Sequence, residues 1–337
     1  MMTSPLTTPS TSIAHRLLQL LNDGRCHSGE ALGRTLNMTR SAVWKIIQKW
    51  RALGVDIQSL PHQGYQMPYP LELLTLERIT AALDPPIRVL LDECVILDKI
   101  HSTNDYLLSR VATHPTQTIA AFAEYQTQAR GRCGRPWIAP FGTNLYFSLL
   151  WHFSKDPVEM MGLSLAMAVA VFRMLQHYGI TQDITLKWPN DVLWKGRKLA
   201  GILIEMIAES HTRCAVVVGI GLNTRMPATY ADQIHTPWTD IYQITHTPPQ
   251  RNQLAGLLLN EVIQALQSFD QHRLHPFLAE WRANDETQGK KVILRSTQET
   301  ITGIMKTISD EGELILVDDS GVETHFLSGE LSLRLTE

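Results

Sequence analysis

A run rich in arginine and glycine is the part of this chain best suited to chemistry with anions. It spans residues 126–137, and Arg130, Arg132 and Arg135 lie close together within it. A buried helix or strand disfavours such a run, because each guanidinium must stay solvated or meet an anion. Glycine lets the backbone approach a ligand closely, and guanidinium groups bind phosphate or carboxylate through charge-assisted hydrogen bonds. We expect a loop that covers an anionic ligand; a plain basic surface loop is the alternative.

A lysine at the end of a predicted strand supplies a second cation. Lys187 lies near the end of the apolar-alternating run 184–188 and two residues before Pro189, where the strand must open into a turn. Its ammonium is a compact point charge that suits a phosphoryl or carboxylate oxygen. One such lysine is more often a solvated strand-end charge. The occurrence of a third motif, Ser102-Thr103-Asn104, favours a functional role.

Together these motifs resemble the biotin protein ligases, specifically the bifunctional bacterial kind that also represses the biotin operon. Each motif is moderately specific, but their joint occurrence in this order is highly specific. The resemblance covers most of the chain. Its motifs are residues 102–104, 124–126, 130–132 with 134–135, 140–142 with 144–146, 187–191, 197–203, 219–223, and 329–330 with 332–334. The chain departs from the family pattern at Ala129, where glycine is usual, and at Cys133, where a basic or polar residue is common.

The resemblance implies a two-step reaction. The carboxylate of biotin attacks the α-phosphorus of ATP to form biotinyl-5′-adenylate and pyrophosphate. A lysine amine of the biotin carboxyl carrier protein of acetyl-CoA carboxylase then attacks the acyl carbon and releases AMP. Because the first step brings two anions together, fixed cations lower its barrier. Lys187 and Arg132 are the catalytic groups that the resemblance implies, with Arg130 assisting and Mg²⁺ offsetting the remaining charge of ATP.

The resemblance also assigns the biotin site. The neutral ureido head needs hydrogen-bond donors and acceptors rather than charges. The assigned residues are Ser102, Thr103, Asn104, Gln126, Arg130, Gly131, Arg132 and Lys187. Ser102 is also expected to cap a helix, with Asp105 completing a capping box. No residue of the chain is assigned as a metal ligand.

Three further positions stay open between a role in the site and a structural one. Trp137 and Leu203 are candidates for an apolar slot beside the ring and valeryl chain of biotin, or they are ordinary core residues. The glycine-containing run 219–223 lies beside the nucleotide or packs at a strand end. Asp191 deprotonates the incoming lysine or caps a turn, and it is left out of the catalytic set.

The N-terminal region has the pattern of a winged helix-turn-helix. Apolar residues recur at helical spacing from Ile13, a short helix follows Ser28, and Thr39 caps a longer helix that ends before Gly54. A hairpin around residues 61–64 supplies the wing. We predict that the helix from residue 40 to 53 is the recognition helix.

The charge of this region favours DNA over a plain three-helix packing module. Residues 1–70 contain seven basic and three acidic residues, so they carry +4 in a chain whose net charge is −3. Arg40, Lys45, Lys49 and Arg51 are expected to face outward from the recognition helix. The predicted DNA-binding residues are Thr39, Arg40, Ser41, Lys45 and Lys49.

The fold class is therefore α+β and multidomain. We predict a winged helix-turn-helix at 12–67, a mixed-sheet α/β catalytic domain at 68–284 and a small SH3-like barrel at 285–337. Runs 119–123, 145–150, 185–188, 201–207 and 215–220 read as strands of the central domain, and 160–178 and 253–270 as long helices. The last domain is expected to contain the short β-runs 291–294, 300–308, 313–317, 322–326 and 332–335, with glycines at regular spacing among them.

Composition indicates an ordinary soluble protein. The apolar stretches fall short of a membrane span, residues 3–11 read as a disordered lead-in, and four cysteines without metal-ligand spacing fit a reducing cytoplasm. We expect operator DNA as a partner and a homodimer when biotinyl-adenylate is bound. Three alternatives remain: a ligase with a vestigial DNA-binding domain, a biotin-sensing transcription factor without catalysis, and a lipoate or octanoyl ligase. The Gly-Gly-Gly run expected of the last is absent from the sequence.

Overall fold

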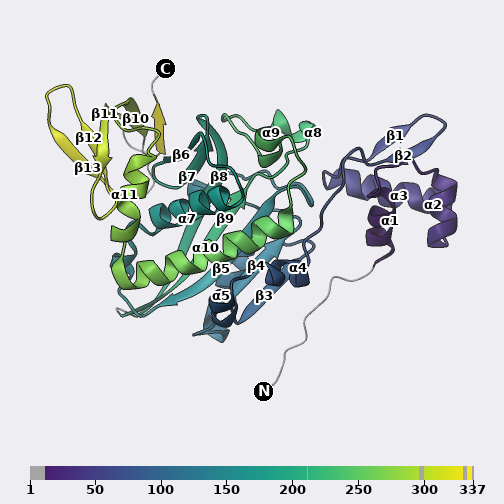
Figure 1. Ribbon diagram of the computed structural model, residues 1–337, viewed down its shortest axis with the longest axis horizontal. Helices are drawn as coiled ribbons and strands as arrows, with labels where there is room; N and C mark the ends of the chain where they lie inside the picture. Colours follow the sequence, from purple (N-terminus) through teal and green to yellow (C-terminus); the bar gives the residue numbers. More distant parts are fainter. Residues whose placement is uncertain (1–11, 211, 296–299, 329–331, 336–337) are drawn as a thin grey trace.

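Three regions follow one another along the molecule, as the ribbon shows (Figure 1). The structure is a computed structural model that describes residues 12–210, 212–295, 300–328 and 332–335. The predicted lead-in at 3–11 and the motif residues Gly329 and Glu330 lie outside the described residues. The helical region lies at one end, the large sheet in the middle and a small β-region at the other end (Figure 1).

The N-terminal region is the predicted winged helix-turn-helix. Its elements are α1 (Ile13–Leu21), α2 (Gly29–Leu36), α3 (Arg40–Ala52), β1 (Gln58–Leu60) and β2 (Gly64–Gln66). Ser12, Ser28 and Thr39 cap the three helices, and each hydroxyl accepts a hydrogen bond from a backbone N–H three residues later. Gly54 follows α3 with a φ of +95°, which a β-carbon would oppose.

The central region is built on a seven-stranded mixed sheet. The strands are β3 (Glu93–Leu97), β4 (Ile119–Ala123), β5 (Leu145–Phe153), β6 (Ile184–Lys187), β7 (Asp191–Trp194), β8 (Arg197–Ser210) and β9 (Arg213–Leu222). Their order is β3-β4-β5-β9-β8-β7-β6. Only the β3–β4 pair is parallel, and every other neighbouring pair in this order is antiparallel.

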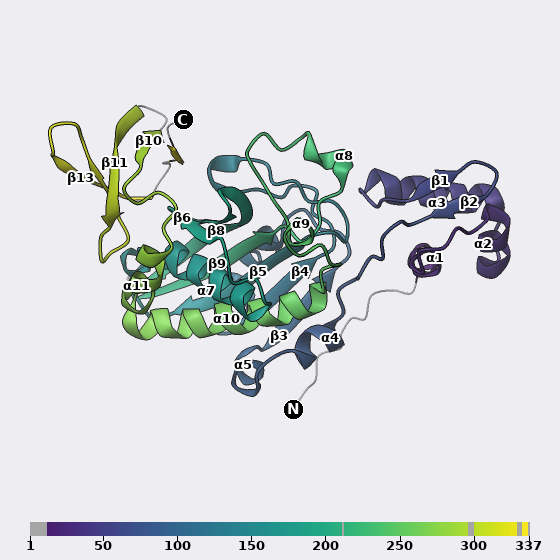
Figure 2. The ribbon, with the colours of Figure 1, turned by 45° about the horizontal axis from the view of Figure 1, so that its top comes forward.

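Helices cover the two faces of this sheet. On one face, α7 (Leu163–His177) and α10 (Arg251–His272) pack side by side, with α11 (His275–Ala283) beside α7 (Figures 1 and 2). On the other face, α6 (Thr103–Leu108) packs on β4, β5 and β9. Strand β4 shows the alternation: Phe122 joins the core under α7 and α10, whereas Ala121 joins the cluster under α6. Short helices complete the region: α4 (Leu76–Ala81), α5 (Pro85–Leu90), α8 (Ala228–Ala231) and α9 (Ile241–Thr245).

Helix α7 qualifies the expectation that no stretch is long enough to cross a membrane. Together with the turn before α7, residues 157–177 form a segment that could cross a membrane, judged by length and composition alone. Eleven of its fifteen helical residues are buried inside the protein, including Met167, Val171 and Leu175. Helix α7 packs against both the sheet and α10, and this burial accounts for its apolar composition.

The C-terminal region forms a five-stranded antiparallel sheet. Its strands are β10 (Lys291–Arg295), β11 (Thr300–Ile308), β12 (Leu314–Val317), β13 (Glu323–Phe326) and β14 (Ser332–Leu335). They follow the order β13-β12-β11-β10-β14, which is that of an open sheet among the described residues. Each of the predicted β-runs forms a strand, while closure of the sheet into a barrel stays a prediction.

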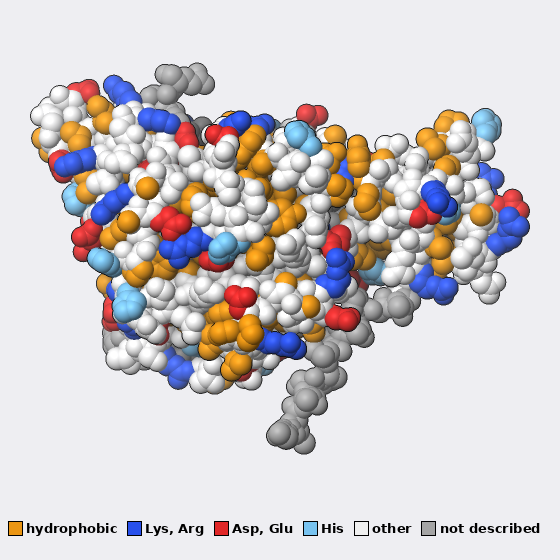
Figure 3. All heavy atoms as spheres, in the orientation of Figure 1, with side chains coloured by type: hydrophobic (Ala, Val, Ile, Leu, Met, Phe, Trp, Pro, Cys, Tyr) orange, Lys and Arg blue, Asp and Glu red, His pale blue; other side chains and the backbone are white. Residues whose placement is uncertain are grey.

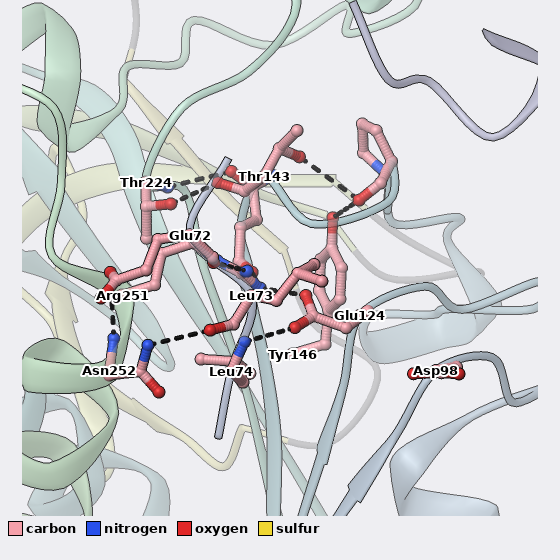
Figure 4. Close-up of polar contacts among 12 residues, drawn as sticks. Glu72, Leu73, Leu74, Asp98, Glu124, Thr143, Tyr146, Thr224, Arg251 and Asn252 are labelled. Carbon is pink, nitrogen blue, oxygen red and sulfur yellow. Dashed lines mark hydrogen bonds and ion pairs between the residues drawn. The ribbon is translucent and has the colours of Figure 1, made fainter. Parts of the chain in front are cut away.

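The segment that joins the first two regions is held against the catalytic domain by a buried ion pair. Arg251, at the start of α10, lies 2.8 Å from the Glu124 carboxylate at the end of β4, and both side chains are at most 3% exposed. Arg251 also donates to the Glu72 carbonyl at 2.6 Å, and the Leu74 N–H donates to Glu124 at 2.6 Å (Figure 4). Asn252 extends the contact by donating to the Leu73 carbonyl at 3.0 Å. Residues 72–74 are thus fixed by charge and backbone hydrogen bonds together.

The winged helix-turn-helix and the catalytic domain share part of one core. Phe141, from the loop before β5, is 1% exposed and belongs to the same buried cluster as Leu17, Val43 and Trp50. Its ring lies 4.7 Å from that of Trp50, and its N–H donates to the Leu53 carbonyl at 2.8 Å. The end of α3 therefore rests directly on the catalytic domain.

Candidate active site

A large cavity opens on the face of the sheet that carries α6. Its volume is about 880 Å³, enough for a drug-sized ligand. Strands β8 and β9 form its floor, α6 and the arginine loop lie on one side, and the turn after β6 lies on another. All eight predicted biotin-site residues line it, together with the candidate slot residues Trp137 and Leu203. The structure thus brings together residues that lie as far apart in sequence as Ser102 and Leu203.

Glycines on the floor make room for this cavity. A β-carbon at Gly221 would lie 2.6 Å from the Trp137 indole, and one at Gly219 would lie 2.3 Å from the Asn104 amide oxygen. Real β-carbons essentially never approach other atoms so closely, so a larger residue at either position would displace Trp137 or Asn104. Gly219 and Gly221 thus line the cavity and also pack closely against other side chains, while a place of run 219–223 beside the nucleotide stays a prediction.

Three of the four polar residues expected at the ureido head, Thr103, Asn104 and Gln126, are linked through hydrogen bonds that include Ser148. Ser102 caps α6, and its hydroxyl accepts from the Asp105 N–H at 3.3 Å. The Gln126 amide oxygen accepts from the Thr103 N–H at 2.7 Å. Ser148 on β5 donates within the same group, 2.5 Å from the Asn104 amide oxygen. Ser102, Thr103 and Asn104 are at most 4% exposed, so their polar groups are held by neighbouring protein groups rather than by solvent.

The arginine-rich run folds as a small hairpin over the cavity. The Trp137 N–H donates to the Ala129 carbonyl at 2.9 Å, and the Gly131 N–H donates to the Arg135 carbonyl at 2.8 Å. At its tip, Cys133 has a φ of +54°, a left-handed conformation that side-chain-bearing residues seldom adopt. The loop is thus closed by backbone hydrogen bonds at its base, and its side chains extend from that frame.

Arg130 is held by two carboxylates. Its guanidinium binds Asp105 through two hydrogen bonds of 2.8 and 2.6 Å, and it binds Glu205 on β8 at 2.9 Å. Hydrogen bonding to Asp105 and Glu205 raises the pKa of Arg130, and the same contact with Arg130 lowers the pKa of Asp105. Only one of the two contacts of the predicted capping box is found. The Ser102 hydroxyl caps α6, but the Asp105 carboxylate binds Arg130 instead of the backbone N–H of Ser102.

Arg132 reaches across the cavity to the turn after β6 and to the C-terminal region. Its guanidinium donates to the Ser328 carbonyl and lies 3.4 Å from the Asn190 amide oxygen. Burial lowers the pKa of Arg132. Lys187 lines the same cavity at the end of β6, opposite Asp191 in the β6–β7 register. The adjacent Trp188 is fully buried, and its indole N–H donates to the Gly312 carbonyl at 3.2 Å, so the C-terminal region supports this turn.

Sequence reasoning missed contacts of polar residues in and beside the cavity. Lys198 lies 2.6 Å from the Asp191 carboxylate, so Asp191 has an ion-pair partner as well as its place after the turn. Lys198 also lies over the Trp137 ring at 5.4 Å. Sequence reasoning also missed Glu205, which binds Arg130. Its position could have indicated a role, because it is the single acidic residue in the otherwise apolar run 202–208.

A second candidate site lies on the surface of the winged helix-turn-helix. Arg40, Ser41, Lys45 and Lys49 are exposed on α3, and the Thr39 hydroxyl caps that helix. Arg51 differs from the expectation, because its guanidinium donates to the Ile57 carbonyl at 2.6 Å and to Ser59 at 2.9 Å. It therefore ties α3 to the wing. Blue basic side chains are visible over this end of the molecule in Figure 3.

Family comparisons cover the three regions separately. Residues 96–223 match the Biotin/lipoate A/B protein ligase family, residues 14–66 match an HTH domain, and residues 287–334 match the Biotin protein ligase C terminal domain. The fold is similar to the biotin protein ligase from Aquifex aeolicus in complex with biotin and ATP. That likeness has a TM-score of 0.62 and 27% identity, and it covers 73% of this chain and all of that one.

Two curated relatives match nearly the whole chain. The bifunctional ligase/repressor BirA of Salmonella typhimurium is 38% identical, over 97% of this chain and 99% of its own length. The protein of the same name from Escherichia coli is 37% identical, over 96% of this chain and 97% of its own length. With its helix-turn-helix, its ligase domain and its C-terminal domain all matched, this chain belongs to the biotin protein ligase family, in the bifunctional ligase/repressor group.

Proposed function

We propose that this protein is an ATP-dependent biotin ligase that also represses transcription of biotin-synthesis genes. The observation that carries the ligase half is the cavity itself. It places a buried polar group suited to a ureido head beside two cationic side chains, Lys187 and Arg132, under one glycine-rich loop. The names of the two near-full-length relatives, and the biotin and ATP in the solved relative, support the same conclusion.

In the proposed mechanism the protein supplies position and charge rather than a nucleophile. Ser102, Thr103, Asn104 and Gln126 hold the ureido head, and the biotin chain lies along the glycine floor beside Trp137. Lys187 bridges the biotin carboxylate and the α-phosphate, which reduces their mutual repulsion. Gly131 lets the loop backbone approach the ligand, and Arg132 neutralises a phosphate oxygen. Arg130, held by Asp105 and Glu205, supports the loop at its base.

Mg²⁺ is proposed as the companion of ATP. Among the described residues, no group of three or more His, Cys, Asp or Glu side chains is suited to hold a metal. Mg²⁺ normally binds through substrate phosphates, water and one or two carboxylates. The cavity offers two carboxylates, Asp191 and Glu286, each paired with a lysine. When bound, the ion would lower the charge on the phosphates.

Transfer to a carrier protein and repression complete the proposal. The acyl acceptor is a lysine of the biotin carboxyl carrier protein of acetyl-CoA carboxylase, and the second partner is operator DNA. Biotinyl-adenylate acts as acyl donor and corepressor by promoting a homodimer, which couples two half-sites. We place the protein in the cytoplasm, where both partners reside. We also propose the domain boundaries 12–67, 68–284 and 285–337.

ATP-dependent transfer of labelled biotin to a purified carrier-protein fragment tests the ligase half directly. Labelled lipoate and octanoate serve as competing acyl donors in parallel reactions, because the family of the central domain includes lipoate ligases. We expect labelling with biotin alone, and none when ATP is omitted. Labelling by lipoate or octanoate in preference to biotin would replace the proposal with that of a lipoate-type ligase. Biotin binding without any transfer would instead indicate a sensor.

Arg132→Ala should release biotinyl-adenylate into solution. The guanidinium joins the loop to Asn190 and Ser328, so its loss opens the cover that shields a reactive mixed anhydride from water. Adenylate in the filtrate after rapid ultrafiltration measures the release. Arg135→Ala is the control, because Arg135 lies exposed on the same loop. Equal retention of adenylate by the Arg132 variant and the wild type would remove Arg132 from this role.

Loss of two exposed lysines should weaken DNA binding in the full-length protein. Lys45→Ala with Lys49→Ala removes two cations from α3 without touching its buried face. We expect the slope of log affinity against log salt concentration to become less steep by about 2, because each lost phosphate contact releases about one counterion fewer. Titrations on the upstream region of the biotin genes, with and without biotin plus ATP, measure this. If wild-type affinity there equals that for unrelated DNA in both conditions, the repressor half is wrong and the domain is vestigial.

A further inference from the structure

Glu205 is a charged residue in an apolar strand, and its carboxylate meets donors from two sides of the cavity. It lies on β8 after Leu203 and Ile204, and its side chain is 28% exposed. One carboxylate oxygen accepts from the Asn104 amide at 2.7 Å. The Arg130 guanidinium lies 2.9 and 3.2 Å from the two oxygens. Glu205 thus joins the ureido-head group to the base of the arginine loop.

The contact with Asn104 determines which way its amide faces. The amide nitrogen donates to Glu205, while the amide oxygen accepts from Ser148 at 2.5 Å. A donor on one side and an acceptor on the other leave one satisfied orientation for an amide. Gly219 lies beneath, and a β-carbon there would lie 2.3 Å from the amide oxygen, so the glycine leaves the space that this orientation needs. Asn104, at 4% exposure, is therefore preorganised by the carboxylate on β8.

The contact with Arg130 anchors the loop. Asp105 holds the same guanidinium from the α6 side through two hydrogen bonds, so Arg130 lies between α6 and β8. In the loop backbone, Arg130 pairs with Pro136 across the base of the hairpin. A side chain fixed on both sides thereby fixes the position from which the loop extends over the cavity.

We propose that Glu205 is a positioning residue for biotin, which orients Asn104 and anchors Arg130 with one carboxylate. This inference rests on the proposed ligase function and extends it to a residue outside the predicted site. Both neighbours of Glu205 are donors, and an ionised carboxylate is acceptor-only, so it satisfies both. A glutamine in its place has one acceptor and one donor group. Its NH₂ group must then face either the Asn104 amide nitrogen, which ends that contact, or the Arg130 guanidinium, which leaves Arg130 only its longer contact of 3.2 Å.

Glu205→Gln in the full-length protein tests this with little change in side-chain volume. We expect the Kd for biotin, measured by calorimetry without ATP, to rise about 10- to 100-fold, since a hydrogen bond to a charged group is lost. The KM for ATP at saturating biotin should rise much less than the biotin Kd, because Arg132, which is proposed to neutralise the phosphate, keeps its own contacts with Asn190 and Ser328. In a cycle with Asn104→Ala, the two effects should be markedly non-additive.

Glu93→Gln is the matched control. Glu93 binds Arg110 at 2.9 and 2.7 Å on β3, outside the cavity, and its side chain is 35% exposed. It should leave biotin affinity unchanged. An unchanged biotin Kd for Glu205→Gln would overturn the inference. Equal losses for biotin and ATP with a lowered Tm would also overturn it, since they indicate a general structural role. A wild-type protein that binds no biotin would overturn the proposed function as well.

Discussion

Replacing Lys187 by alanine should slow formation of biotinyl-adenylate by about 10²–10³-fold, the usual cost of one well-placed charge-stabilising group. Lys187 ends β6 and lines the cavity that also holds the predicted biotin residues. Without it, the biotin carboxylate would approach the α-phosphate with less compensating positive charge. The measurement is the rate of pyrophosphate release with biotin and ATP both saturating, so that the chemical step is separated from binding.

Lys195→Ala is a suitable control for this experiment. Lys195 lies on the turn after β7, its side chain is 57% exposed, and it is 3.4 Å from the Asp183 carboxylate. Removing it takes away one lysine from the same part of the sheet and should leave the rate unchanged. Both variants should unfold at the wild-type temperature. A folded Lys187→Ala protein that makes adenylate at nearly the normal rate would show that Lys187 takes no part in the mechanism.

Glu124→Ala should lower the free energy of unfolding by about 3–5 kcal/mol, because it leaves the Arg251 charge buried without its partner. The two side chains are 2% and 3% exposed, so solvent cannot replace the lost carboxylate. The Leu74 N–H also loses its acceptor, and the segment 72–74 loses part of its attachment (Figure 4). The shift of the urea midpoint, followed by tryptophan fluorescence, measures the effect.

A more exposed ion pair provides the comparison. Glu280 lies 2.7 Å from Arg173, with side chains 27% and 36% exposed, and Glu280→Ala should cost at most about 1 kcal/mol. Replacing Glu124 by leucine together with Arg251 by methionine should recover part of the loss, since both charges are then removed. Similar costs for Glu124→Ala and Glu280→Ala would contradict the importance of burial in this attachment.

Short-range patterns predicted the winged helix-turn-helix and most strands. Each helix start there depends on a serine or threonine and the N–H three residues later, and each helix end depends on a nearby glycine or asparagine. Such signals involve residues only three or four positions apart, so they can be read from the sequence alone. The predicted strands of the central and C-terminal regions were also found, because short runs of continuous or alternating apolar residues can be recognised without knowing their partners.

The contacts of the active site were less accessible to sequence reasoning. Glu205 meets Arg130 from 75 residues away and Asn104 from 101 residues away. No local pattern encodes such a pairing, because it depends on the strand order of the finished sheet. Arg51 shows the same limit at short range: helical spacing placed it outward, yet it bends back to the wing backbone. The roles of the predicted biotin and DNA residues stay predictions.

The placement of Phe141 bears on how proteins of this architecture can evolve. A DNA-binding domain that closed its own core could be exchanged between proteins by recombination as a self-contained cassette. Here Phe141 fills the core beside Trp50, while Pro140 and Tyr230 lie against Gly54. Transferring residues 12–67 alone would leave a cavity in the donated domain and an apolar side chain exposed in the recipient. Regulation and catalysis are therefore expected to be inherited together, and a working chimera must carry residues 140–142 with the domain they complete.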